Sequence, residues 1–248
     1  MSPVSGPRVD LSVLLFPELA DARSEVIRAL QALGGGDYAA AVLGLGKKSA
    51  EDAALNLALE TAPCAPAIEL YTGVLYDHLD AATLAPDTRA RLEGSTWIAS
   101  GLFGVVRTTD LLPNHRLAVG TKLPGIGSLA AWWRPRLRDA LPDLAGETII
   151  DCRSGGYRAA YPAAEAHVVE IAVVEERAAG RKVITHMAKK WRGLAVRHLV
   201  EVGGEPLDAL TRLGARPEIL DVEIAAAEPT RAGGSTTRVT LVTASTET

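Results

Sequence analysis

The stretch from Trp97 to Gly120 constrains this chain most, because it joins an apolar strand pattern to a polar loop. It reads WIASGLFGVVRTTDLLPNHRLAVG, and its first half predicts one buried strand interrupted by Gly101 and Gly104. Glycine has no Cβ and lets a neighbouring backbone come close. The polar residues that follow this strand are Arg107, Asp110, His115 and Arg116. A rigid strand that leads into a polar loop is a common construction for a binding cleft.

Composition bounds the class of protein. The 248 residues are 48% hydrophobic and 23% charged, which suits one large or two small globular domains. No apolar run approaches the ~20 residues that span a bilayer, and the first ten residues lack the pattern of a secretory leader. Cys64 and Cys152 are too few for a disulfide framework or a cysteine-rich zinc site. We therefore expect a cytoplasmic protein with no membrane partner.

Charge is distributed unevenly along the chain. The net charge is −4, but residues 91–200 hold 16 Lys and Arg against 10 Asp and Glu, a local balance of +6. The remainder of the chain carries −10. A positive surface on an acidic protein is compatible with a phosphate-bearing ligand, and an ordinary solvated face is the alternative.

Hydrophobic spacing and turn residues predict a mixture of helices and strands. The expected helices lie at 21–33, 50–61, 86–92, 128–141, 188–202 and 206–213. Besides the strand that begins at Trp97, the expected strands lie at 11–16, 148–150, 168–174, 182–186, 219–224 and 237–242. The strands at 168–174 and 182–186 are expected to form an antiparallel hairpin.

Three blocks of this sequence resemble the YaaA family of bacterial peroxide-stress proteins. They are S-G-L-F-G-V-V-R-x-x-D-L-x-P-x-x-R-L from Ser100, Y-T-G-V-L-Y from Tyr71, and A-K-K-W-R-G from Ala188. The resemblance covers roughly residues 66–200. It implies one α+β domain over residues 1–248, with mixed sheets, surrounding helices and a positively charged cleft. It also implies a role in protection against peroxide, with DNA binding and lowered free iron.

One loop departs from the family pattern. The family usually reads P-P-S-E or P-A-K-T after its first strand, whereas this chain reads Phe16-Pro17-Glu18-Leu19. The customary Ser or Lys is missing. If that loop contributes to a site, this protein has changed the site.

A glycine turn at residues 123–131, LPGIGSLAA, is similar to the hairpin of a helix-hairpin-helix motif. In that motif Gly125 and Gly127 would offer backbone N–H groups to a DNA phosphate. Pro113, Asn114 and Gly120 interrupt the helix that should come before it. The alternative is a simple turn in which Ser128 caps the next helix.

The start of the helix at 188–202 carries Lys189, Lys190 and Arg192. Cations are unfavourable at a helix N-terminus unless an anion binds there. The alternative is that these long side chains extend into solvent. Arginine suits bidentate recognition of phosphate, and tyrosine can stack on a base.

Two functions remain open from these residues, with a non-catalytic binding module as a third, less specific alternative. The first is binding of DNA or another phosphate-bearing ligand, for which the expected contacts are Tyr71, Ser100, Arg107, Asp110, Arg116, Gly125, Gly127, Arg153, Ser154, Lys189 and Arg192. The second is an enzyme that acts on a nucleobase-like or anionic small molecule, with Lys190, His186 and Tyr157 as its catalytic residues. No standard catalytic motif or metal-ligand spacing is present, so we expect no cofactor and no metal. No oligomeric state is predicted.

Overall fold

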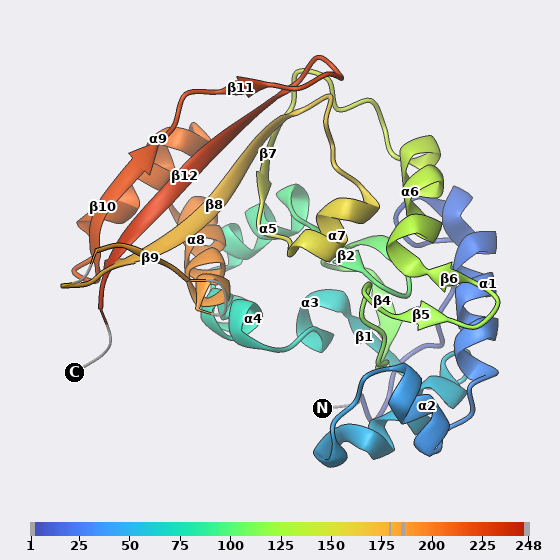
Figure 1. Cartoon of the computed structure of the whole chain (residues 1–248). Coiled ribbons are helices and arrows are strands. Elements are labelled where there is room, and N and C mark those ends of the chain that lie inside the picture. The colour runs from blue at the N-terminus through green and yellow to red at the C-terminus, as the bar shows by residue number, and fades with distance from the viewer. Residues whose placement is uncertain (1–2, 179, 185–186, 246–248) are drawn as a thin grey trace. The chain divides into compact units, whose positions relative to one another are not determined.

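Segments that are far apart in the sequence combine into two units in the computed structural model (Figure 1). The structure describes residues 3–178, 180–184 and 187–245. The first unit takes the chain up to Tyr71, then Glu93–Pro142 and Arg153–Pro162. The second unit takes Thr72–Leu92, Asp143–Cys152 and the chain from Ala163 onward. Helices and mixed strands both contribute, which confirms the α+β class.

The first unit consists of short helices and two-stranded ladders. Its helices are η1 (Pro17–Leu19), α1 (Ala20–Gln31), α2 (Asp37–Val42), η2 (Lys47–Ala58), α3 (Ala67–Leu70), α6 (Leu129–Ala140) and α7 (Gly155–Ala160). Its strands are β1 (Cys64–Pro66), β2 (Trp97–Ser100), β3 (Gly104–Arg107), β4 (Leu111–Pro113), β5 (Lys122–Leu123) and β6 (Gly127–Ser128). The antiparallel pairs are β1 with β4, β2 with β3, and β5 with β6.

The stretch that begins at Trp97 is a hairpin and not the single strand expected from the sequence. Strand β2 reverses after Ser100, and β3 returns along it from Gly104 to Arg107. Gly104 has a φ of 75°, and a Cβ there would lie 3.1 Å from the buried ring of Trp133. The glycine therefore permits both the reversal and the close approach of α6.

The strand expected at 11–16 is also wrong. Leu14 and Leu15 are buried, as an apolar run predicts, but the segment forms turns and bends. The Asp110 carboxylate accepts the N–H of Leu15, and Arg23 donates to the carbonyls of Leu15 and Phe16. Side chains thus satisfy backbone groups that a strand would pair with a neighbouring strand.

The second unit is built on one mixed six-stranded sheet. Its strands are β7 (Thr148–Asp151), β8 (His167–Glu176), β9 (Lys182–Val183), β10 (Ile219–Ile224), β11 (Glu228–Pro229) and β12 (Ser235–Ala244). The central order is β10-β12-β8-β7, as Figure 1 shows, with β8 parallel to both β7 and β12. The β8–β9 pair is antiparallel, as predicted from the sequence.

Helices accompany this sheet. They are α4 (Val74–Leu79), η3 (Ala81–Thr83), α5 (Pro86–Ser95, whose last residues belong to the first unit), α8 (Ala188–Val202), α9 (Pro206–Thr211) and η4 (Arg212–Ala215). Alternate residues of β8 and β12 pack with α8 and the α9–η4 segment in one core, which includes Val169, Ile171, Val239, Trp191 and Leu210. In the described part of the chain, no helix is long and apolar enough to cross a membrane.

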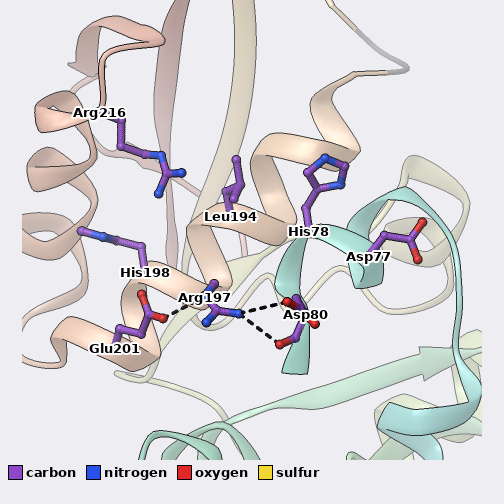
Figure 2. A pocket seen from close by; sticks show the side chains of 8 residues that line it. All are labelled: Asp77, His78, Asp80, Leu194, Arg197, His198, Glu201 and Arg216. Carbon is purple, nitrogen blue, oxygen red and sulfur yellow. Dashed lines mark hydrogen bonds and ion pairs between the residues drawn. The ribbon is translucent and has the colours of Figure 1, made fainter. Parts of the chain in front are cut away.

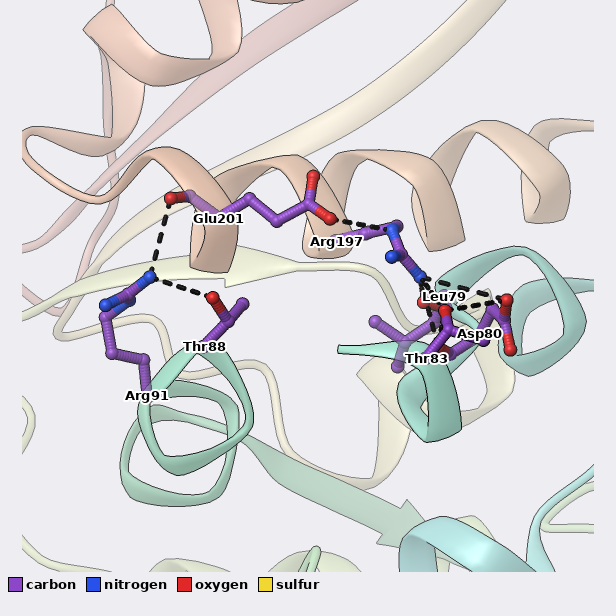
Figure 3. Close-up of polar contacts among 7 residues, drawn as sticks. All are labelled: Leu79, Asp80, Thr83, Thr88, Arg91, Arg197 and Glu201. Atoms are coloured by element: carbon purple, nitrogen blue, oxygen red, sulfur yellow. Dashed lines mark hydrogen bonds and ion pairs between the residues drawn. The ribbon is translucent and has the colours of Figure 1, made fainter. Parts of the chain in front are cut away.

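Two arginines of the second unit bind the carboxyl ends of its helices (Figure 3). Arg197 donates to the carbonyls of Leu79 and Asp80 at the end of α4, at 3.1 and 3.0 Å. Arg91 donates to the carbonyls of Val200 and Glu201 at the end of α8. The last carbonyls of a helix have no partner within the helix, and a cation there also complements the helix dipole.

Candidate functional site

Tyr71 and Ser100, from two of the family blocks, meet directly in the first unit. The Tyr71 hydroxyl donates to Ser100 Oγ at 2.7 Å, and the same oxygen accepts the N–H of Phe103 at 3.2 Å. Ser100 is almost fully buried. These contacts close the β2–β3 turn, so the Ser100 hydroxyl is used by the fold and is not presented to a ligand.

His115 lies against the same group. Its ring makes edge-to-face contacts with Tyr71 and Phe103, at centroid distances of 5.8 and 5.3 Å. Burial lowers the pKa of His115 and the charge of Arg116 lowers it further, while a contact with the Pro113 carbonyl opposes both. The lowered pKa favours the neutral imidazole, which packs between the two aromatic rings while its Nδ1 contacts the Pro113 carbonyl.

Asp110 links two segments of the first unit. Its Oδ2 accepts the N–H of Leu15 at 3.0 Å and the N–H of Arg107 at 2.9 Å. Its Oδ1 lies 3.7 Å from the Arg107 guanidinium. The Asp110 side chain is buried, whereas the Arg107 side chain is 49% exposed. Of these two predicted contact residues, Arg107 alone faces solvent.

Arg23 is the residue of this region that the sequence analysis missed. It is fully buried, and its guanidinium donates to the carbonyls of Leu15, Phe16, Phe103 and Val105. Burial lowers its pKa to about 10, while the nearby carboxylates of Asp110 and Glu18 act in the opposite direction. The sequence contains a pattern that could have predicted its burial, because Arg23 is spaced at helical intervals from the buried residues Val26, Ile27 and Leu30 of α1.

Arg116 is engaged within the fold. Its Nε donates to Asp52 Oδ2 at 2.8 Å. The side chain of the buried Asn56 accepts the backbone N–H of Arg116 and donates to the backbone carbonyl of Arg116. The predicted role of Arg116 in holding an anion would need the Asp52 contact to open.

Gly125 lies in the tight turn between β5 and β6, and Gly127 is the first residue of β6; their φ values are 79° and 83°. Strands and loops precede this turn, and no helix lies between Leu111 and Leu123. The helix-hairpin-helix interpretation is therefore wrong. The alternative is confirmed, since Ser128 Oγ accepts the N–H of Ala131 and caps α6.

The segment Arg153–Tyr157 leads from β7 into α7. Ser154 is the N-cap position of α7 and is exposed. Burial raises the pKa of the Tyr157 phenol, and a contact with the Val119 backbone lowers it in part. A Cβ at Gly156 would lie 3.1 Å from the Val119 side chain, so the two segments are in close contact.

The basic first turn of α8 belongs to the second unit. Lys189 is exposed, and the Lys190 ammonium lies 5.1 Å from the Trp191 ring centroid. Arg192 differs from both, because its Nε and Nη2 donate to the Ile171 carbonyl at 3.2 and 3.1 Å. His186, the other predicted acid or base, lies outside the described residues. The convergence of residues from all three blocks on one cleft stays a prediction.

A shallow hollow of about 320 Å³ lies between α4, α8 and the α9–η4 segment of the second unit (Figure 2). The residues that line it are Asp77, His78, Asp80, Leu194, Arg197, His198, Glu201 and Arg216. In Figure 2, Arg197 is turned toward Glu201 and Asp80. The lining mixes carboxylates and cations and contains none of the predicted contact residues. Within the described ranges, no group of three or more His, Cys, Asp or Glu side chains could hold a metal ion.

Comparison with known proteins agrees with the three sequence blocks. The family model described as peroxide stress protein YaaA matches residues 8–216. A UPF0246 protein of Streptomyces coelicolor is 40% identical over 211 residues, which is 81% of each chain. A UPF0246 protein of Corynebacterium glutamicum is 41% identical over 199 residues, 79% of this chain and 78% of its own.

Proposed function

Because the chain belongs to the YaaA family of peroxide stress proteins, we propose that it acts in the peroxide stress response by binding DNA or another phosphate-bearing ligand through exposed cations. The cations belong to the basic segment 91–200, whose charge balance is +6 in a protein of net charge −4.

The first turn of α8 carries this proposal. It holds two adjacent lysines and no acidic residue, and the side chain of Met187 at its N-cap position makes no capping hydrogen bond. A helix N-terminus carries a partial positive charge and presents N–H donors, so a nearby anion is stabilised there. Lys189 is exposed, and Lys190 lies beside the ring of Trp191. The turn therefore concentrates positive charge that is unfavourable unless an anion balances it.

The enzyme interpretation is the alternative. Of the arginines that would hold an anionic substrate, Arg116 is paired with Asp52. Within the second unit, Arg192 donates to a strand carbonyl. Both arginines are also predicted contacts for a phosphate-bearing ligand, so these pairings bear on either function, and the proposal rests on Lys189 and Lys190.

Fluorescence anisotropy of a labelled blunt duplex, titrated at several salt concentrations, tests the proposal. We expect the logarithm of the affinity to fall linearly with the logarithm of salt concentration, by about 0.9 per neutralised phosphate. The double variant Lys189→Gln/Lys190→Gln should bind more weakly and reduce this slope by about two contacts.

The chain offers a matched control. Lys47 and Lys48 are also adjacent and lie at the start of a helix, η2, but they are outside the basic segment, and Glu51 and Asp52 follow them in the same helix and offset their charge. Lys47→Gln/Lys48→Gln makes the same change in net charge and should bind like the unaltered protein. The proposal would be contradicted if the two double variants lost the same amount of duplex affinity, or if the affinity did not change with salt concentration. A thermal-shift screen with nucleobases and nucleotides would then address the enzyme alternative.

A further inference from the structure

Two aromatic side chains and one arginine form a partly exposed group in the first unit, and none of them belongs to the proposed α8 site. Trp97, on β2, is 45% exposed. The Phe16 ring meets it edge to face at a centroid distance of 5.3 Å and an angle of 89°. Arg107 is the direct cross-strand partner of Trp97 in the β2–β3 hairpin. We call Phe16, Trp97 and Arg107 the stacking surface.

The hairpin places the two larger members on one face. Directly opposed residues of an antiparallel pair point to the same side of the sheet, with Cβ atoms about 5 Å apart. The neighbouring pair, Ile98 and Val106, points to the other side and is buried. Trp97 and Arg107 are therefore on the face of the hairpin turned to solvent. The Arg107 guanidinium also lies 3.7 Å from Asp110 Oδ1, but its side chain is 49% exposed and remains accessible to a phosphate.

The third member is held in place by buried charges. Phe16 has φ 57° and ψ 76°, a left-handed conformation that is rare for a bulky side chain. Arg23 binds the Phe16 carbonyl together with the Phe103 and Val105 carbonyls of the hairpin. Asp110 binds the N–H groups of Leu15 and Arg107. The loop and the hairpin are thus joined on both sides, and the aromatic pair is pre-arranged.

Such a combination fits an unpaired base with its phosphate. Bases stack on aromatic rings in complexes with single-stranded nucleic acid, and a nearby arginine binds the backbone. In a duplex the faces of the bases are occupied by their neighbours, so a ring on a flat surface finds no partner there. We infer that the stacking surface binds single-stranded DNA by stacking a base on Trp97 with a phosphate at Arg107. This inference rests on the proposed function and names a second contact surface for the same ligand class.

The inference is tested by measuring two affinities. One is for a labelled oligothymidylate, which has no secondary structure, and the other is for a duplex of equal length. Trp97→Ala should weaken oligothymidylate binding about tenfold, from the usual loss on removing one stacking ring. Trp97→Phe should recover most of it, and duplex binding should not change in either variant. Arg107→Gln should also weaken oligothymidylate binding and reduce its salt slope by about 0.7, the value for one phosphate contact on a single strand.

A matched control is Tyr38→Ala, because Tyr38 is an exposed aromatic residue of α2 in the same unit. It should bind oligothymidylate as the unaltered protein does. Quenching of tryptophan fluorescence by oligothymidylate should fall strongly in Trp97→Phe. Of the other three tryptophans, Trp133 and Trp191 are buried, and the half-buried Trp132 has the Arg136 guanidinium 3.3 Å from its ring centroid.

The outcomes separate this inference from the proposed function. Oligothymidylate binding that is absent, or that is the same in Trp97→Ala as in the unaltered protein, overturns the stacking surface. Duplex binding that depends on Lys189 and Lys190 can survive that result. Binding of oligothymidylate that depends on Trp97, without any binding of duplex, supports the stacking surface and overturns duplex recognition.

Discussion

Single buried residues organise the first unit, and Arg23 is the main example. A guanidinium has five N–H donors in a fixed plane, and here it satisfies carbonyls from two segments that are distant in the sequence. A buried carbonyl that loses its hydrogen-bond donor destabilises the folded state by the free energy of its desolvation. One side chain therefore determines the path of the Phe16 loop.

We expect Arg23→Ala to lower the free energy of unfolding by about 3 kcal/mol or more, because it leaves several buried carbonyls without a donor. Urea denaturation followed by circular dichroism measures the change. Arg28→Ala, at an exposed position of the same helix, should shift stability by less than about 0.5 kcal/mol. Equal stability of the two variants would show that the carbonyls find other partners.

Individual residues of the predicted site divide into two groups. Ser100, Asp110 and Arg192 are polar groups that the fold itself uses. Arg107 and Lys189 remain accessible to a ligand. Residue type alone does not separate these groups, because the sequence does not distinguish an arginine that donates to a strand carbonyl from an arginine that faces solvent.

Helices α4 and α8 pack in close contact, and two of the family blocks meet there. A Cβ at Gly193 of α8 would lie 2.1 Å from the Leu75 carbonyl of α4. The glycine of the A-K-K-W-R-G block is therefore required by helix packing. Its place in a motif that resembles a binding site does not make it a ligand contact.

Gly193→Ala should destabilise the protein by about 2 kcal/mol, although alanine is the better helix former by roughly 1 kcal/mol. The clash is with backbone, which cannot rotate away. Thermal unfolding compares it with Gly94→Ala in α5, where a Cβ meets nothing within 4 Å and stability should stay the same or rise slightly. A stabilised Gly193→Ala variant would mean that α4 and α8 separate easily.

For the whole molecule, the order of segments is as important as the elements themselves. Neither unit is continuous in the sequence, and the second unit takes α4 and β7 from the first 152 residues. Strand β7 pairs with β8, and α4 packs on α8. The expectation of a single domain over residues 1–248 stays a prediction. Because the segments of the two units alternate along the chain, it can be tested by asking whether a continuous fragment folds alone.

A fragment of residues 163–248 should fail to fold, because it lacks β7 and α4 and exposes the surfaces of β8 and α8 that they cover. Far- and near-ultraviolet circular dichroism with urea denaturation, compared with the full chain, tests this. A fragment with native-like spectra and a cooperative transition would show that the carboxyl-terminal elements suffice for a fold.

The sequence by itself determined the family, the α+β class and most of the elements, including α1, α6, α8 and the β8–β9 hairpin. These follow from local periodicity, turn residues and short motifs, which are written in consecutive letters. Only the tertiary structure decided that β2 and β3 form a hairpin, that residues 11–16 are not a strand and that Arg23 holds four carbonyls. Those outcomes depend on which distant groups satisfy a buried polar atom, and spacing along the chain does not contain that information.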